Sequence, residues 1–127
     1  MNQGKDQSDI NAKLSQAEVL KDEGKFDESI ALLLEILEED PQHVICHFTL
    51  AVLYGKVDQH AKAIEHGETA VALDPNDPFS YTAMSVTYQR AYAGTDDQSF
   101  IVKAEDAMEK SRQVAQQQHP PGQGPSC

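Results

Sequence analysis

Residues 38–43 read EEDPQH and residues 72–77 read ALDPND, so the chain carries a similar Asp-Pro turn twice, 34 residues apart. The same offset aligns Ile30 with Ile64, together with other apolar and small residues around them. Several matches in one register indicate an internal repeat, and a unit of this length fits a helix, a turn and a second helix. The sequence therefore predicts stacked helix pairs.

Apolar residues recur at helical spacing on both sides of these turns, which predicts amphipathic helices. The Asp-Pro pairs end helices because proline disfavours the helical conformation in the residue before it. Pro78 is a favourable first helical position. The predicted helices span about 8–23, 27–39, 44–56, 60–73 and 78–90, and a last helix follows a short insertion at residues 91–96.

The predicted last helix has the character of a capping element. Its apolar stripe runs from Phe100 to Val114, and its opposite face is charged. Stacked repeats need such a polar outer side at their end. We expect a flexible arm at residues 1–7 and a repeat domain at 8–115, with units 10–43, 44–77 and 78–115. Residues 116–127 are polar and rich in proline and glycine, which predicts a disordered tail.

Charge and hydropathy narrow the possible functions. Among the 127 residues, 21 are acidic and 10 are basic, which gives a net charge of -11. This balance argues against nucleic-acid binding, which needs basic residues for the phosphates, and against an anionic membrane surface. No apolar run approaches the roughly 20 residues of a spanning helix, and residues 1–10 do not resemble a signal peptide. We expect a soluble cytoplasmic protein without a cofactor.

The repeat unit resembles the tetratricopeptide repeat. The resemblance is carried in the second unit by Leu50, Ala51, Tyr54, Ala63, Ala70, Asp74 and Pro75. It implies an all-α, right-handed α-solenoid of three helix pairs with a longer, polar-faced C-terminal capping helix. It also implies a concave surface formed by the first helix of each pair.

The resemblance further implies which residues line that concave surface. They are Leu14, Glu18, Lys21, Ile45, Phe48, Val52, Lys56, Phe79, Thr82, Val86, Gln89 and Arg90. The middle of this set is apolar, and three of the chain's few basic residues lie at one end. Such a groove suits an amphipathic helix or an extended segment of another protein that carries some acidic residues.

Chaperone-binding members of the family hold a terminal carboxylate with a clamp of basic and amide side chains. The corresponding positions here carry Leu14, Glu18, Thr49, Phe79 and Ala83. None of these is a clamp residue. The groove is therefore expected to bind its partner in another way.

Three alternatives remain open at this point. The groove can be filled by the arm or the tail of the same chain. It can also be filled by a second copy of the chain, and the protein would then be a self-assembling scaffold. The apolar run Leu32–Leu34 is a second candidate surface for a homo-oligomer. A metal-binding module is a remote alternative, because His43, Cys46 and His47 lie close together but no fourth ligand is nearby. No nucleophile, base and orienting residue can be nominated, so we expect no catalysis.

Overall fold

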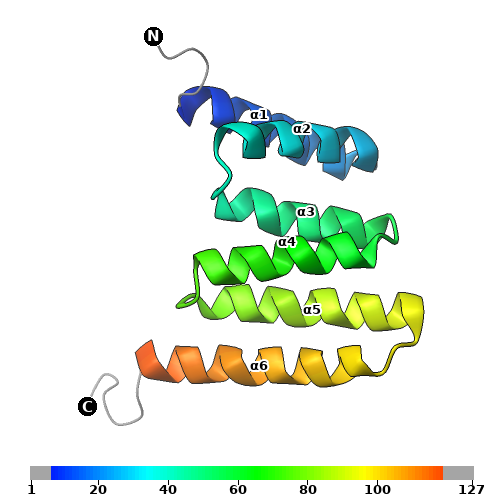
Figure 1. Ribbon diagram of the computed structural model, residues 1–127. Helices are drawn as coiled ribbons and strands as arrows, with labels where there is room; N and C mark the ends of the chain where they lie inside the picture. The colour runs from blue at the N-terminus through cyan, green and yellow to red at the C-terminus, as the bar shows by residue number, and fades with distance from the viewer. Residues whose placement is uncertain (1–6, 119–127) are drawn as a thin grey trace.

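The computed structural model describes residues 7–118, and this part of the chain is helical throughout, without strands. Its helices are α1 (Gln7–Asp22), α2 (Phe26–Glu39), α3 (Val44–Lys56), α4 (His60–Leu73), α5 (Pro78–Thr95) and α6 (Ser99–Gln118). They stack in chain order, with α1 and α2 at one end and α6 at the other (Figure 1). This arrangement confirms the predicted all-α solenoid. No helix among the described residues has the length and apolar character needed to cross a membrane.

The turns end and begin helices where the sequence predicts. The last residues before the two repeated prolines, Asp40 and Asp74, are the C-caps of α2 and α4. The Asp77 carboxylate accepts a hydrogen bond of 2.9 Å from the backbone N–H of Phe79 at the start of α5. Such caps satisfy N–H groups that have no partner within the helix. The helix boundaries are thus set by local chemistry as well as by packing.

The insertion at residues 91–96 differs from its prediction. Instead of a longer turn, α5 continues to Thr95 and stops at Asp96, whose φ of 61° is left-handed. The extension packs closely against the start of α4, where Gly94 lies beside the His60 ring. A side chain at position 94 would collide with that ring. The extra residues therefore lengthen a helix, and glycine provides the space for it.

Both ends of the repeat domain also extend beyond the predicted limits. Gln7, assigned to the arm, is the first residue of α1, and α6 continues past residue 115 to Gln118. The rest of the predicted arm and tail, residues 1–6 and 119–127, lies outside the described residues.

The core consists of two clusters that share α4. The first joins the opening helices through Ile10, Ala17, Ile30, Leu33, Ile36, Cys46, Leu50, Leu53, Tyr54 and Ala63. The second joins Met84, Tyr88, Ala104 and Ala107, with Ile64 and Val71 packed against them. Because α4 contributes to both clusters, it couples the two halves of the stack.

Buried serines connect the helices of the first and third pairs. Ser29 Oγ donates a hydrogen bond of 2.7 Å to the carbonyl oxygen of Ala17. Ser85 Oγ donates one of 2.9 Å to the carbonyl oxygen of Ala104. Both serines are fully buried. Their small side chains allow the paired helices to approach closely, and the hydrogen bonds satisfy the buried hydroxyl groups.

The core assignment predicts different costs for two neighbouring leucines. Leu33 is fully buried, whereas Leu34 is 38% exposed. We expect Leu33→Ala to lower the free energy of unfolding by about 2–5 kcal/mol, because it removes buried methyl groups and leaves a cavity. Leu34→Ala should cost less than about 1 kcal/mol. Urea unfolding followed by circular dichroism measures both, and equal losses would contradict this core.

Candidate functional site

An apolar groove runs along the surface formed by α1, α3 and α5. It consists of two adjoining hollows of about 250 Å³ each, which share Phe48, Val52 and Phe79. The first is completed by Lys21, Ile45 and Thr49. The second is completed by Ala51, Thr82, Ala83, Val86, Thr87 and Arg90. We call this surface the apolar groove.

The groove leaves large apolar side chains in contact with solvent. Phe79 is 62% exposed and Ile45 is 56% exposed. The rings of Phe48 and Phe79 meet edge to face across α3 and α5, with centroids 5.8 Å apart and planes at 67°. Aromatic pairs favour this geometry. A contiguous exposed apolar patch of this kind is typical of an interaction surface.

The basic residues at the edge of the groove have different surroundings. Lys21 Nζ lies 3.4 Å from a Glu18 carboxylate oxygen and 4.0 Å from Asp22. Neither Lys56 nor Arg90 has a carboxylate within 4.0 Å among residues 7–118. Lys56 Nζ instead lies 5.8 Å from the centre of the Phe26 ring. Lys21 is therefore partly neutralised, whereas no carboxylate of residues 7–118 forms an ion pair with Lys56 or Arg90.

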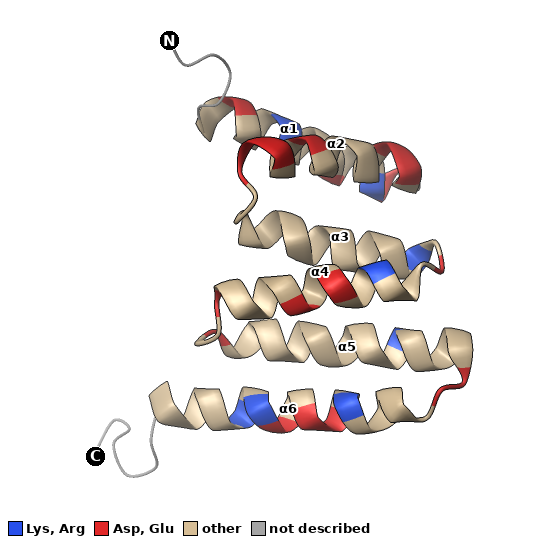
Figure 2. Ribbon diagram, viewed as in Figure 1, with Lys and Arg blue, Asp and Glu red and all other residues tan. Residues whose placement is uncertain are grey.

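Lys56 and Arg90 line a third hollow of about 280 Å³, which we call the cationic hollow. Its lining also includes Gly55, Asp58, His60, Ala93 and Gly94. Arg90 lines the apolar groove as well, so the two surfaces adjoin. Each of α3 and α5 carries a single charged residue, Lys56 and Arg90 respectively (Figure 2).

The structure brings most of the sequence-predicted residues together. Eight of them line the apolar groove: Lys21, Ile45, Phe48, Val52, Phe79, Thr82, Val86 and Arg90. Lys56 lies in the adjoining cationic hollow, and Glu18 reaches the groove through its contact with Lys21. Leu14 packs against the core instead. Gln89 donates a hydrogen bond of 3.2 Å to Ser85 Oγ and lines a different hollow.

The small residues of the groove were not among the residues predicted from the sequence. Thr49, Ala51, Ala83 and Thr87 complete the two hollows beside the larger side chains. The signal that could have found them is helical spacing, because Phe79, Ala83 and Thr87 follow one another at intervals of four residues on α5.

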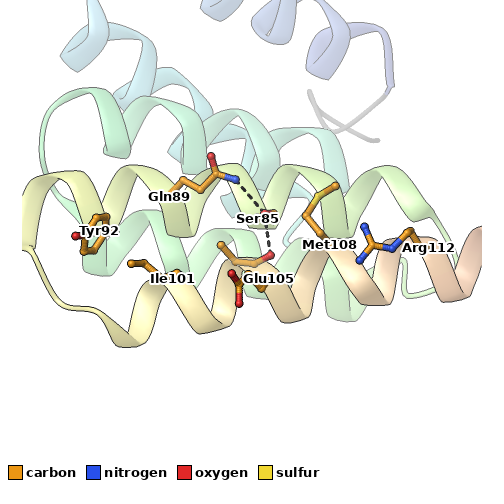
Figure 3. A pocket seen from close by; sticks show the side chains of 8 residues that line it. Ser85, Gln89, Tyr92, Ile101, Glu105, Met108 and Arg112 are labelled. Atoms are coloured by element: carbon orange, nitrogen blue, oxygen red, sulfur yellow. Dashed lines mark hydrogen bonds between the residues drawn. The ribbon is translucent and has the colours of Figure 1, made fainter.

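A larger hollow of about 540 Å³ lies between α5 and α6, and Gln89 belongs to it (Figure 3). Tyr92, Ile101 and Met108 give it an apolar lining, and Arg112 at its edge is paired with Glu109 at 2.7 Å. Gly55, the residue 34 positions before Gln89, has Arg90 of α5 beside it. Gln89 thus occupies in the third pair the position that Gly55 occupies in the second, where α5 packs against it. The hollow beside Gln89 therefore lies where the first helix of a further pair would pack.

The residues proposed as metal ligands have other partners. The Cys46 thiol donates to the Leu33 carbonyl oxygen at 3.2 Å, and burial raises its pKa to about 12. His43 Nδ1 accepts a hydrogen bond from the backbone N–H of Cys46 and so caps α3. Metal binding by cysteine requires the thiolate, so this arrangement does not favour the metal-binding alternative.

His47 instead forms a pair with His66 of α4. The two Nδ1 atoms lie 3.0 Å apart, and His47 Nε2 lies 2.9 Å from the Pro41 carbonyl oxygen. Because a carbonyl oxygen can only accept, His47 carries its proton on Nε2 and accepts at Nδ1 from His66. Burial, and then the neighbouring His47, lower the pKa of His66. With both rings neutral, these hydrogen bonds connect Pro41, in the turn before α3, through His47 to His66 of α4.

Comparison with known proteins identifies the family. The tetratricopeptide repeat family model matches residues 10–43 and 46–77. The chain belongs to the tetratricopeptide repeat family, which confirms the resemblance seen in its sequence. The mouse protein O-mannosyl-transferase TMTC1 is 33% identical over 66 residues, which are 52% of this chain and 7% of that protein.

Solved structures share the fold at low identity. A chain of the CopN-Scc3 complex has a TM-score of 0.73 and 18% identity, with 93% of this chain and 64% of that chain covered. A MamA structure has a TM-score of 0.69 and 18% identity, with coverages of 86% and 59%. The first tetratricopeptide domain of Spaghetti (RPAP3), bound to the HSP90 peptide SRMEEVD, has a TM-score of 0.61 and 18% identity, with coverages of 87% and 95%.

The histidine pair predicts a pH dependence of stability. The pKa of His66 in the fold is below its ordinary value of 6.5, so below that pH the unfolded chain binds more protons than the folded chain. We expect the free energy of unfolding to fall as the pH drops from about 7 to about 5. His66→Gln should reduce this dependence. His43→Asn, which retains a capping acceptor outside the pair, should keep the wild-type dependence, and urea unfolding at each pH provides the comparison.

Proposed function

We propose that this protein is a non-catalytic interaction module that binds a peptide or helical segment of a partner protein in the apolar groove. The observation that carries the proposal is the edge-to-face pair of half-buried Phe48 and exposed Phe79, flanked by the exposed side chains of Ile45 and Val86. Aromatic anchors in such pockets dominate the binding energy of many interfaces. Burying one further large apolar side chain there contributes about 1.5–3 kcal/mol.

The structural relatives support an interaction role. One belongs to a complex of two named proteins, CopN and Scc3, and another holds an HSP90 peptide. The clamp positions carry apolar, acidic or hydroxyl side chains in this chain. We therefore propose that a partner is held mainly through apolar anchors, without the clamp for a terminal carboxylate.

Self-association is the second candidate function. The hollow between α5 and α6 favours it, because its position corresponds to a surface that a following helix covers. The net charge of -11 opposes it, since copies of the chain repel one another at low salt. We therefore place partner binding first.

Solution mass separates the two candidates. We expect light scattering to give the mass of a monomer, 14.0 kDa, across protein concentrations at both low and high salt. A mass that rises with concentration in the wild type and returns to 14.0 kDa in Ile101→Glu would instead favour self-association through the α5–α6 hollow.

The groove itself is tested with peptides selected from a phage-displayed random library on the immobilised wild-type protein. We expect Phe79→Glu to weaken the selected peptides by at least about tenfold, because it places a charge among apolar anchors. Val102→Glu is the matched control, because Val102 is 57% exposed but lies on α6, outside the groove. Fluorescence anisotropy measures the affinities. Equal binding by both variants, or no enriched peptide, would refute the proposal.

A further inference from the structure

We infer that the cationic hollow holds the side-chain carboxylate of an aspartate or glutamate in the bound segment. This inference rests on the proposed function, because the hollow adjoins the apolar groove through Arg90. It adds the chemical identity and the position of a second recognition element beside the apolar anchors.

The first argument is the unbalanced charge of the hollow. Lys13, Lys21, Lys25 and Arg112 all have carboxylates within 4.0 Å. Among the described residues, the basic side chains without a carboxylate within 4.0 Å are Lys56, Lys62, Arg90, Lys103 and Lys110. Lys103 and Lys110 share a hollow with two acidic residues, Glu68 and Asp106, whereas Lys56 and Arg90 share theirs with Asp58 alone. Two cationic side chains that line one hollow repel each other, and an anion placed between them lowers that energy.

The second argument is the absence of acidic side chains from the two helices that carry Lys56 and Arg90. Neither α3 nor α5 contains an aspartate or glutamate. A carboxylate that approaches along these two helices therefore meets none of their side chains with a like charge, until it reaches the rim at Asp58. Charge-assisted hydrogen bonds from arginine and lysine to carboxylates are among the stronger polar contacts in interfaces.

The rim of the hollow selects a monoanion. Asp58 also lines the hollow, and its side chain is 88% exposed and 3.6 Å from His60 Nε2. Together with Lys56 and Arg90 it gives the lining a formal charge of +1. One carboxylate neutralises this charge, whereas a dianionic phosphate exceeds it and leaves a net negative charge in the hollow. A carboxylate therefore fits this hollow better than a phosphorylated side chain.

Helix geometry gives the spacing of the two elements in the partner. Phe48 and Lys56 are eight residues apart on α3, and Phe79 and Arg90 are eleven apart on α5. These separations correspond to about 12 and about 16 Å along the helices. An extended segment covers this distance in about four to five residues. The partner should therefore carry its acidic residue that far from its apolar anchor.

The test uses the peptides selected from the phage-displayed library, each made in two forms, with its acidic residue intact or changed to the amide. On the wild-type protein, we expect the amide form to bind about tenfold more weakly. On the double variant Lys56→Gln with Arg90→Gln, the two forms should differ by less than about twofold. The control is Lys103→Gln with Lys110→Gln, which also removes two positive charges but from α6, outside the hollow.

The outcomes separate this inference from the proposed function. Loss of the acid preference in the double variant but not in the control supports the inference. Peptides that depend on Phe79 yet bind equally in both forms would overturn the inference and leave the groove function standing. A library that yields no binder would overturn both. A third measurement shows whether the double variant folds. Phe79→Glu is added to the double variant, and the affinity for the amide peptide is compared with and without it. A loss of affinity on adding Phe79→Glu shows that the double variant still presents a folded groove.

Discussion

Each helix pair in this protein has an apolar face that it cannot cover by itself, and the next pair must cover it. Leu33 of α2 and Leu50 and Leu53 of α3 are fully buried where the first two pairs meet. Met84 of α5 lies against Gly67 of α4, where the second and third pairs meet. Since stability in a solenoid depends on such neighbour interfaces, the groove exists only because the stack holds α1, α3 and α5 side by side.

The helices that could be predicted are those whose ends are chemically marked. The prolines at 41 and 75 and the small residues around them define the first four helices, and the resemblance to the tetratricopeptide repeat places the groove on the first helix of each pair. The end of α5 could not be predicted, because it depends on the contact between Gly94 and His60, which lie far apart in the sequence. No local signal distinguishes a longer turn from a longer helix there.

The candidate site, like the fold, could be predicted from the sequence only in part. Repeat position alone brings Phe48, Val52 and Phe79 to one surface, and it also selects Leu14 and Gln89, whose side chains face elsewhere. The charge balance at the groove edge depends on which side chains pair, and helical spacing indicates only part of this. Lys21 pairs with Glu18, three residues before it on α1. That Lys56 and Arg90 have no carboxylate within 4.0 Å in residues 7–118 depends on how the helices pack. The contact between His47 and His66 likewise joins residues 19 positions apart on facing helices.

The separation of charge between the helices has a consequence for the kinetics of association. The chain as a whole is strongly acidic, yet α3 and α5 carry only a cation each. At low salt the net charge acts on an approaching anion before the local cations do, whereas at 0.1 M salt a Debye length of about 10 Å screens the distant charges. Added salt therefore speeds the first encounter with an acidic ligand and also speeds its release. For the proposed function, this predicts a preference for short ligands of low net charge over long polyanions.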